Sequence, residues 1–390
     1  MMSSRPGRHF LQIPGPSNSP DRILAAMAKP TMDHRGPDFG VFGKKLLNDI
    51  RGIFRTEHPV VIYPSSGTGA WEAALVNLFQ PGDKLLMVET GQFATLWQEL
   101  AQRLGLDAEF IPGDWRRGVQ PDVVEARLKA DSGRTIKGVC MVHNETSTGA
   151  TSSVSEVRKA IDAAGHDALF LVDTISGLGC MDYRHDEWGV DVSIGGSQKG
   201  LMTPPGLGMN AIGPRALEAS KVGGVRRSYW DWAAMLEINS GGYFPYTPAT
   251  NLLYGLREAI DMLNEEGLDN VFARHDRLAS AARQAVQAWG LEIQCEIAED
   301  RSNVLTALRV PNGCDADNVR AVILKNFDVS LGNGLGKVKG KVFRIGHLGD
   351  FNEPMLLGTL AAVETGLRLA DVPHQSGGVD AAMRYLAETA

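Results

Sequence analysis

The segment Val190-Asp191-Val192-Ser193-Ile194-Gly195-Gly196-Ser197-Gln198-Lys199-Gly200 joins a short apolar run to a cluster of small residues that contains one lysine. The apolar run predicts a β-strand that carries Lys199 to the edge of a sheet. A lysine among small residues can lose its hydration, which lowers its pKa and favours the amine that forms a Schiff base. Most lysines after a strand are solvated surface charges, so this segment alone leaves both interpretations open.

An aspartate twenty-six positions earlier decides between them. Asp173 closes the apolar run Ala168–Val172, so a strand that ends in Asp precedes the strand that leads to Lys199. In a site for pyridoxal phosphate (PLP), a carboxylate keeps the pyridine nitrogen protonated while a lysine carries the aldehyde. The pair Asp173 and Lys199 therefore predicts a PLP site.

The composition of the 390-residue chain is that of an ordinary globular protein with a large core, 43% hydrophobic and 22% charged. A net charge of −7 argues against a nucleic-acid partner or an anionic membrane surface. No apolar run is long enough to span a bilayer, and the N-terminus lacks the apolar core of a signal peptide. Because four cysteines do not make a disulfide framework, we expect a cytoplasmic protein.

Three regions are expected along the chain. Residues 1–20 contain Pro14, Pro16 and Pro20 and predict an extended arm. Residues 256–390 begin with long helical patterns and continue with short β-rich runs, which predicts a smaller α+β domain.

Residues 21–255 alternate β-rich and helical patterns, which predicts a large α/β domain with a mostly parallel sheet covered on both faces. Ligands of such sheets bind beyond the carboxyl ends of the strands. Seven strands are expected: Val60–Tyr63, Lys84–Glu89, Asp107–Ile111, Gly138–His143, Leu169–Asp173, Val190–Gly195 and Gly208–Ile212.

Three strand exits carry candidate cofactor contacts. Ser66, Gly67 and Thr68 open a helix whose free N–H groups suit a phosphate, although the same residues also fit a plain strand–helix turn. Phe93 follows another strand, where its ring either stacks on a cofactor or packs in the core. The hydroxyls of Thr146, Ser147 and Thr148 either bond a cofactor phenolate or cap the next helix.

Arg344 lies in an apolar run, where a buried guanidinium needs an anionic partner. A substrate α-carboxylate matches its fork geometry, and an internal acid is the alternative. The histidines show no ligand spacing, so no metal site is expected.

The chain resembles the class V aminotransferases of fold-type I, and among them the serine–glyoxylate and alanine–glyoxylate aminotransferases. The resemblance covers nearly the whole chain. It rests on seven stretches in order: Pro14–Asn18, Ser66–Ala74, His143–Gly149, Val172–Asp173, Gly196–Lys199, Tyr243–Pro248 and Phe343–Gly349.

This resemblance implies a role for each candidate residue. Lys199 is the Schiff-base lysine that also moves the substrate proton, and Asp173 is the partner of the pyridine nitrogen. The other cofactor contacts that it implies are Ile175 and Phe93 on the two ring faces, Thr148 at the ring hydroxyl, and Ser66, Gly67, Thr68 and Gln198 at the phosphate. Substrate contacts are implied for Arg344 at the α-carboxylate and for the Pro14–Asn18 arm, including Gly15, which closes over the substrate.

The resemblance also implies a homodimer, or a larger assembly, with an active site shared across subunits. Thr247, together with Tyr246 or Tyr243, is expected to reach the phosphate of the neighbouring subunit. The implied reaction is a ping-pong transfer of an amino group from an L-amino acid to glyoxylate, which gives glycine and a 2-keto acid.

The amino donor stays open between serine and aspartate. An aspartate donor needs a second cation, for which Arg35, Arg226 and Arg227 are candidates. A PLP lyase or desulfurase would need a reactive cysteine, and Cys314 has no basic neighbour to lower its pKa. The remaining alternative is a non-catalytic PLP-binding protein.

Overall fold

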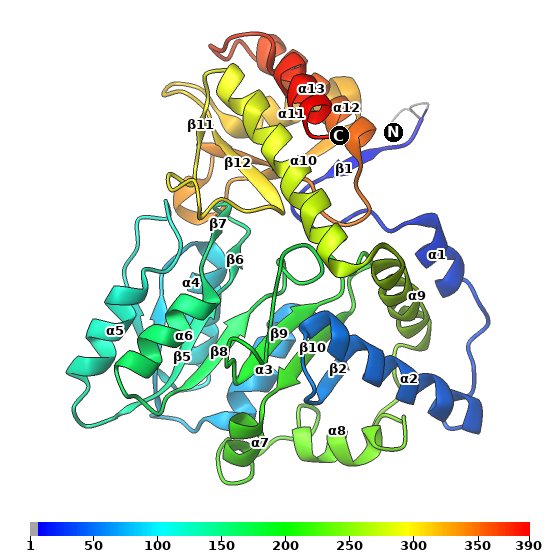
Figure 1. The fold of residues 1–390 in the computed structure, drawn as a ribbon, viewed down its shortest axis with the longest axis vertical. Helices are drawn as coiled ribbons and strands as arrows, with labels where there is room; N and C mark the ends of the chain where they lie inside the picture. The colour runs from blue at the N-terminus through cyan, green and yellow to red at the C-terminus, as the bar shows by residue number, and fades with distance from the viewer. Residues whose placement is uncertain (1–6) are drawn as a thin grey trace.

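The computed structural model describes residues 7–390, so the first six residues of the arm lie outside the described part of the chain. Its larger sheet has seven strands in the order β2-β10-β9-β8-β5-β3-β4 (Figure 1). Only β10 runs antiparallel to its neighbours, which confirms the mostly parallel sheet. The strands are β2 (Val60–Pro64), β3 (Lys84–Val88), β4 (Asp107–Ile111), β5 (Ile136–Val142), β8 (Leu169–Asp173), β9 (Val192–Gly196) and β10 (Leu207–Ile212).

Helices cover both faces of this sheet. Successive side chains of β2 enter different cores, with Val60 and Ile62 in one and Val61 and Tyr63 in the other. The continuous apolar strands therefore have a packing partner on each side. The helices of the first core are α2 (Pro37–Phe54), α5 (Pro121–Ala130), α6 (Val154–Ala163) and α9 (Thr250–Glu266); those of the second are α3 (Gly67–Leu78), α4 (Gln92–Arg103), α7 (Pro214–Ser220) and α8 (Trp232–Asn239).

A second sheet of five strands lies above the first in Figure 1, in the order β1-β13-β14-β12-β11. It is antiparallel except where β1 runs parallel to β13, so part of the predicted arm is a strand of this distant sheet. The strands of this sheet are β1 (Phe10–Gln12), β11 (Glu292–Ile293), β12 (Leu305–Arg309), β13 (Val329–Asn333) and β14 (Val342–Gly346). The helices that share its core are α10 (Leu268–Ala288), α11 (Ala316–Phe327), α12 (Glu353–Leu369) and α13 (Gly378–Glu388).

Three small elements complete the connections. Helix α1 (Asp21–Met27) packs on α9, and a single turn of 3-10 helix spans Gly336–Val338. A hairpin of β6 (Asn144–Glu145) and β7 (Ala150–Thr151) follows β5 at the carboxyl edge of the large sheet. No helix within residues 7–390 combines the length and apolar character that crossing a membrane requires.

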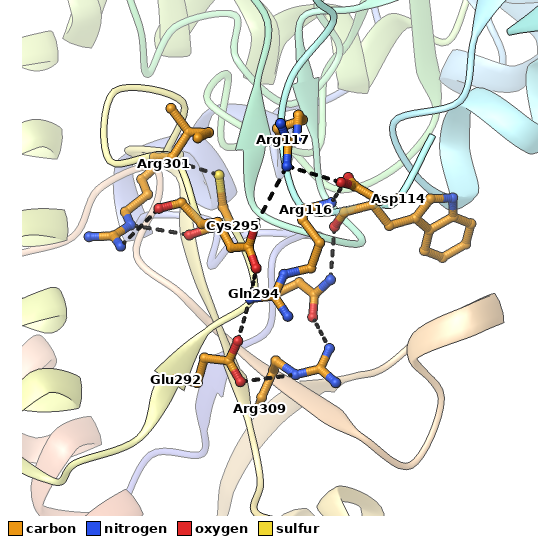
Figure 2. A network of polar contacts seen from close by, with 11 residues as sticks. Asp114, Arg116, Arg117, Glu292, Gln294, Cys295, Arg301 and Arg309 are labelled. Carbon is orange, nitrogen blue, oxygen red and sulfur yellow. Dashed lines mark hydrogen bonds and ion pairs between the residues drawn. The ribbon is translucent and has the colours of Figure 1, made fainter. Parts of the chain in front are cut away.

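A polar network joins the two sheets (Figure 2). Arg116, in the loop after β4, pairs with Glu292 and with Glu296 across the boundary. Gln294 donates a 2.8 Å hydrogen bond to the carbonyl of Trp115, and it accepts one of 2.6 Å from Arg309. These contacts fix β11 and β12 to the edge of the large sheet, and with them the orientation of β14.

Candidate active site

A cavity of about 120 Å³ lies at the carboxyl edge of the large sheet. Larger surface hollows of about 500 Å³ lie near β4 and near the N-terminal arm, but neither contains Lys199 or Asp173. Eight predicted site residues line the smaller cavity: Ser66, Gly67, Thr68, Phe93, Asp173, Ile175, Gln198 and Lys199. Thr146, one of the three hydroxyl residues that the sequence offers at this edge, also lines the cavity, together with four residues that were not predicted: Trp71, Val142, Asn144 and Ser176.

Lys199 follows β9 by three residues and is buried, with 9% of its surface exposed. Burial and, as a smaller effect, the nearby guanidinium of Arg344 lower the pKa of its amine to about 8. Its Nζ donates to the carbonyl of Pro14 in the arm. The lysine is therefore desolvated and loses its proton more readily than an exposed lysine, which favours a Schiff-base amine.

Asp173 ends β8 and is buried beside the same cavity. Burial raises the pKa of its carboxyl to about 7, and the carboxylate of Glu145 acts in the same direction. Two N–H groups hold its oxygens: the backbone of Ile175 donates to Oδ1 at 2.8 Å, and the indole of Trp71 donates to Oδ2 at 3.0 Å. A protonated pyridine nitrogen is the cation that such a buried carboxylate lacks.

The opposite end of the cavity suits a phosphate. Ser66 precedes the first turn of α3, which begins at Gly67 and Thr68. The side chain of Ser66 accepts no hydrogen bond from the first N–H groups of this helix, so these groups can bind a phosphate. Glycine is needed at position 67, because a Cβ there would come within 2.2 Å of the Ile175 side chain. Elsewhere in the lining, Oε1 of Gln198 and Oδ1 of Asn144 are buried without a hydrogen-bond partner among the described residues, and as acceptors they suit a donor group of a ligand and not its phosphate. These observations show that the cavity fits PLP.

Phe93 reaches the cavity from the first turn of α4, which is capped by residues about fifty positions away. Glu145 accepts hydrogen bonds from the backbone N–H groups of Phe93 and Ala94, both at 3.1 Å. Ser147 accepts from Gln92 at 2.9 Å and donates to Glu145 at 2.6 Å. Glu145 is fully buried. Its carboxylate therefore fixes the first turn of α4 and, with it, the place from which Phe93 enters the cavity.

Thr148 does not line the cavity. Its hydroxyl lies near the carbonyls of Thr90 and Glu145, at 3.4 and 3.5 Å, inside the turn between β6 and β7. Thr146, two residues earlier, lines the cavity instead. Three consecutive hydroxyl residues occupy this turn, and only the hairpin geometry separates their roles, so Thr146 replaces Thr148 as the candidate for the ring hydroxyl.

Arg344 lies on β14 beside Lys199 and is 6% exposed. Its Nε donates to the carbonyl of Asn333 at 2.8 Å, and its Nη1 donates to that of Thr146 at 2.7 Å. Among the described residues it forms no ion pair, so the internal acid that the sequence left open is not found there. Burial lowers its pKa to about 10, while the buried carboxylate of Glu145, which lies within electrostatic range without forming an ion pair, acts in the opposite direction. A buried guanidinium without an ion pair has donors available for a carboxylate, which keeps Arg344 a candidate for substrate binding.

The N-terminal arm also contacts Lys199. Ser17 donates to the carbonyl of Lys199 at 2.8 Å and, through its N–H, to that of Gln198 at 2.9 Å. Gly15 has a φ of 97°, and a Cβ there would lie 2.3 Å from the Lys199 side chain. The arm therefore contacts the lysine directly, as its predicted closing role requires.

The remaining predicted residues lie away from this centre. Arg35 and Arg226 are exposed, and Arg227 donates to the backbone carbonyls of Val76, Val225 and Ser220. Tyr246 and Thr247 do not line the cavity, and Thr247 is exposed. None of the four cysteines lines the cavity, and no group of His, Cys, Asp or Glu within residues 7–390 could hold a metal ion.

The chain matches the family described as aminotransferase class-V over residues 10–336. It is 48% identical to a serine–glyoxylate aminotransferase of Methylorubrum extorquens, over 98% of this chain and 97% of the relative. It is 43% identical to an L-aspartate–glyoxylate aminotransferase of Paracoccus denitrificans, over 97% and 96%. The fold matches the crystal structure of pyridoxamine–pyruvate aminotransferase from Mesorhizobium loti with a TM-score of 0.92 and 26% identity over both whole chains. The chain therefore belongs to the class-V aminotransferases, and its cofactor is the pyridoxal phosphate that its sequence predicts.

Proposed function

We propose that this protein transfers the amino group of L-serine to glyoxylate, which yields glycine and the 2-keto acid of serine. One observation carries the proposal: Arg344 is a buried guanidinium near Lys199 that forms no ion pair among residues 7–390, and it donates to the carbonyl of Thr146, which lines the cavity. Arg344 itself lies outside the lining, and none of the lining residues is an arginine. One such cation matches a donor with a single carboxylate. The relatives named serine–glyoxylate aminotransferase support this donor.

The side chains have the following roles in the proposal. Bound PLP supplies the electron sink for the carbanion that forms when the substrate loses its Cα proton. Lys199 carries the cofactor and moves that proton, because its amine is desolvated and lies within the site. Asp173 keeps the pyridine nitrogen protonated, and Arg344 binds the α-carboxylate through the edge of its guanidinium that holds no partner.

The aspartate donor is the second candidate, supported by the relative from Paracoccus denitrificans. Its side-chain carboxylate would need Arg35 or Arg226, both of which are exposed in the single chain. Either arginine would then have to be supplied by another subunit.

A homodimer with shared active sites is part of the proposal. The ring of Tyr246 stacks on Tyr229 at 4.5 Å, and the Tyr246 hydroxyl is buried without a partner among the described residues. Thr247 beside it is exposed, as is Val222 at 85%. We infer that this segment meets the phosphate bound by the partner subunit through the exposed Thr247, and that the Tyr246 hydroxyl reaches the phosphate only if its side chain turns outward in the assembly. Light scattering of the holoenzyme tests the assembly.

Two further features complete the proposal. The sequence predicts an arm at 1–20, a large domain at 21–255 and a small domain at 256–390, and we propose the same three parts with a later boundary for the small domain. Leu256, Ala259, Ile260 and Leu263 of α9 pack in the first core of the large sheet, whereas a separate core begins at Leu278. A cytoplasmic location is proposed because all four cysteines are unpaired.

A half-reaction screen tests the function. Single amino acids are added to the holoenzyme while the absorbance of the bound cofactor is followed, with Lys199→Ala as the blank. Conversion by serine but not aspartate supports the proposal. Conversion by aspartate alone selects the second candidate, and conversion by no amino acid contradicts transamination.

A further inference from the structure

Two tryptophans form a stacked pair at the cofactor cavity, one of them in its lining, and they differ in one polar contact. Trp71 on α3 and Trp97 on α4 are both almost fully buried, and their rings are 5.7 Å apart and inclined by 12°. The indole N–H of Trp71 donates to Oδ2 of Asp173 at 3.0 Å. The indole N–H of Trp97 is buried without a partner among the described residues. Packing is common to both rings, whereas the contact with the carboxylate belongs to Trp71 alone.

The contact gives Asp173 a second fixed oxygen. Its Oδ1 is held by the N–H of Ile175, and without Trp71 the Oδ2 atom would have no donor from the protein. A carboxylate held at both oxygens cannot rotate about its χ2 angle. Trp71 also lines the cavity, so its indole lies next to the place where the pyridine ring would bind.

The charged groups around Asp173 make this donor important. Burial and the carboxylate of Glu145 both raise the pKa of Asp173, whereas Lys199 lowers it. The buried phenol of Tyr183 is a further titratable group within range. The N–H groups of Ile175 and Trp71 lower the pKa of Asp173. The indole of Trp71 does so as an uncharged donor that does not itself titrate.

We propose that Trp71 is a positioning residue for the cofactor: its indole N–H orients the Asp173 carboxylate and keeps it ionised, so that the pyridine nitrogen meets a charged and fixed oxygen. The inference rests on the role of Asp173 in the proposed function. It assigns Trp71 no contact with the substrate, and it makes Trp97 a packing residue only.

The test compares Trp71→Phe with Trp97→Phe. Both variants remove an indole from the same stacked pair, and only the first removes a donor to Asp173. The dissociation constant of PLP is measured by equilibrium dialysis of the apo-enzyme from pH 5.5 to 9. A hydrogen bond to a charged group predicts weaker binding in Trp71→Phe by roughly tenfold at pH 7. Because Asp173 loses a donor to its ionised form, the acid-side midpoint of binding moves to higher pH.

The expected result for Trp97→Phe is wild-type affinity, within about threefold, and an unmoved midpoint. Equal weakening of Trp71→Phe at every pH, or the same shift in both variants, would overturn the proposal. Should Trp71→Phe fail to fold by circular dichroism, benzothienylalanine at position 71 keeps the ring shape and loses only the N–H. Asp173→Asn serves as the reference: unchanged PLP binding there contradicts the role of Asp173 itself, whereas a failure confined to position 71 contradicts only the role of Trp71.

Discussion

The two sides of Lys199 are built in different ways. The cofactor side consists largely of residues at strand ends of one sheet, with Asp173 at the end of β8 and Ser66–Thr68 after β2. The substrate side joins three separate regions: the arm at Gly15, β14 at Arg344, and the hairpin, whose backbone carbonyl at Thr146 accepts from Arg344 while its hydroxyl is the candidate for the cofactor side. A parallel sheet brings strand ends together by its own topology. The substrate side, in contrast, exists only when the small sheet is docked onto the large one.

Lys199→Ala is the largest perturbation and removes the residue common to both sides. We expect the half-reaction rate to fall by roughly 10²- to 10⁴-fold or more, because general acid–base catalysis and the covalent link are lost together. Stopped-flow absorbance with serine measures the rate. A variant that retained wild-type rates would exclude Lys199 as the proton carrier.

Arg344→Gln separates the two sides. The expected outcome is a rise of about 10²-fold in KM for the amino donor, because a charge-assisted bond to the carboxylate is lost. The PLP dissociation constant should stay within about threefold of wild type. If PLP binding weakened as much as donor binding, the two sides would not be independent.

Glu145→Gln affects both sides at once. The carboxylate caps α4 at Phe93, and the adjacent carbonyl of Thr146 holds Arg344. Since the amide has only one acceptor oxygen, we expect PLP affinity and kcat/KM each to fall by roughly 10- to 100-fold. Titration with PLP and steady-state kinetics check the two values. A loss on one side alone would show that the hairpin does not couple them.

The pH dependence of cofactor attachment reports the state of Lys199. Its pKa is lowered to about 8, and the neutral amine is the reactive form. The rate at which PLP reacts with the apo-enzyme should therefore rise about tenfold from pH 7 to pH 9 and level off above the pKa. Rapid mixing of apo-enzyme and PLP gives the profile, and a midpoint near 10.5 would mean that the amine is not desolvated.

Arg116→Met is the smallest perturbation and acts on the boundary between the sheets. It removes the pairs with Glu292 and Glu296, which are partly exposed and contribute little stability. We expect KM for the donor to rise a few-fold while PLP affinity stays constant, because only β14 and Arg344 depend on the docking. Lys129→Met, at an exposed pair with Glu125 remote from this boundary, is the control and should leave KM unchanged.

Much of the cofactor side is readable from the sequence. The patterns predict β4 and β8 with the limits that the structure has, and they place Asp173 and Lys199 at one edge of a sheet. Trp71 is not predicted, because a tryptophan in an apolar helical pattern reads as a core residue. Glu145 was likewise missed, although an acid directly after a buried strand was a usable signal. Its partners Phe93 and Ala94 lie about fifty residues away.

The sequence by itself determined the strand and helix periodicity and the Asp–Lys pair that predicts the cofactor, and its seven matching stretches gave the resemblance to the family. These follow from local residue order, since strand exits in a parallel sheet meet at one edge whatever the details of packing. Only the tertiary structure decided which hydroxyl of Thr146 and Thr148 faces the cavity and which tryptophan holds Asp173. It also decided that Arg344 has no internal acid for a partner. These depend on contacts between segments far apart in the chain, which side-chain burial and the docking of two sheets select.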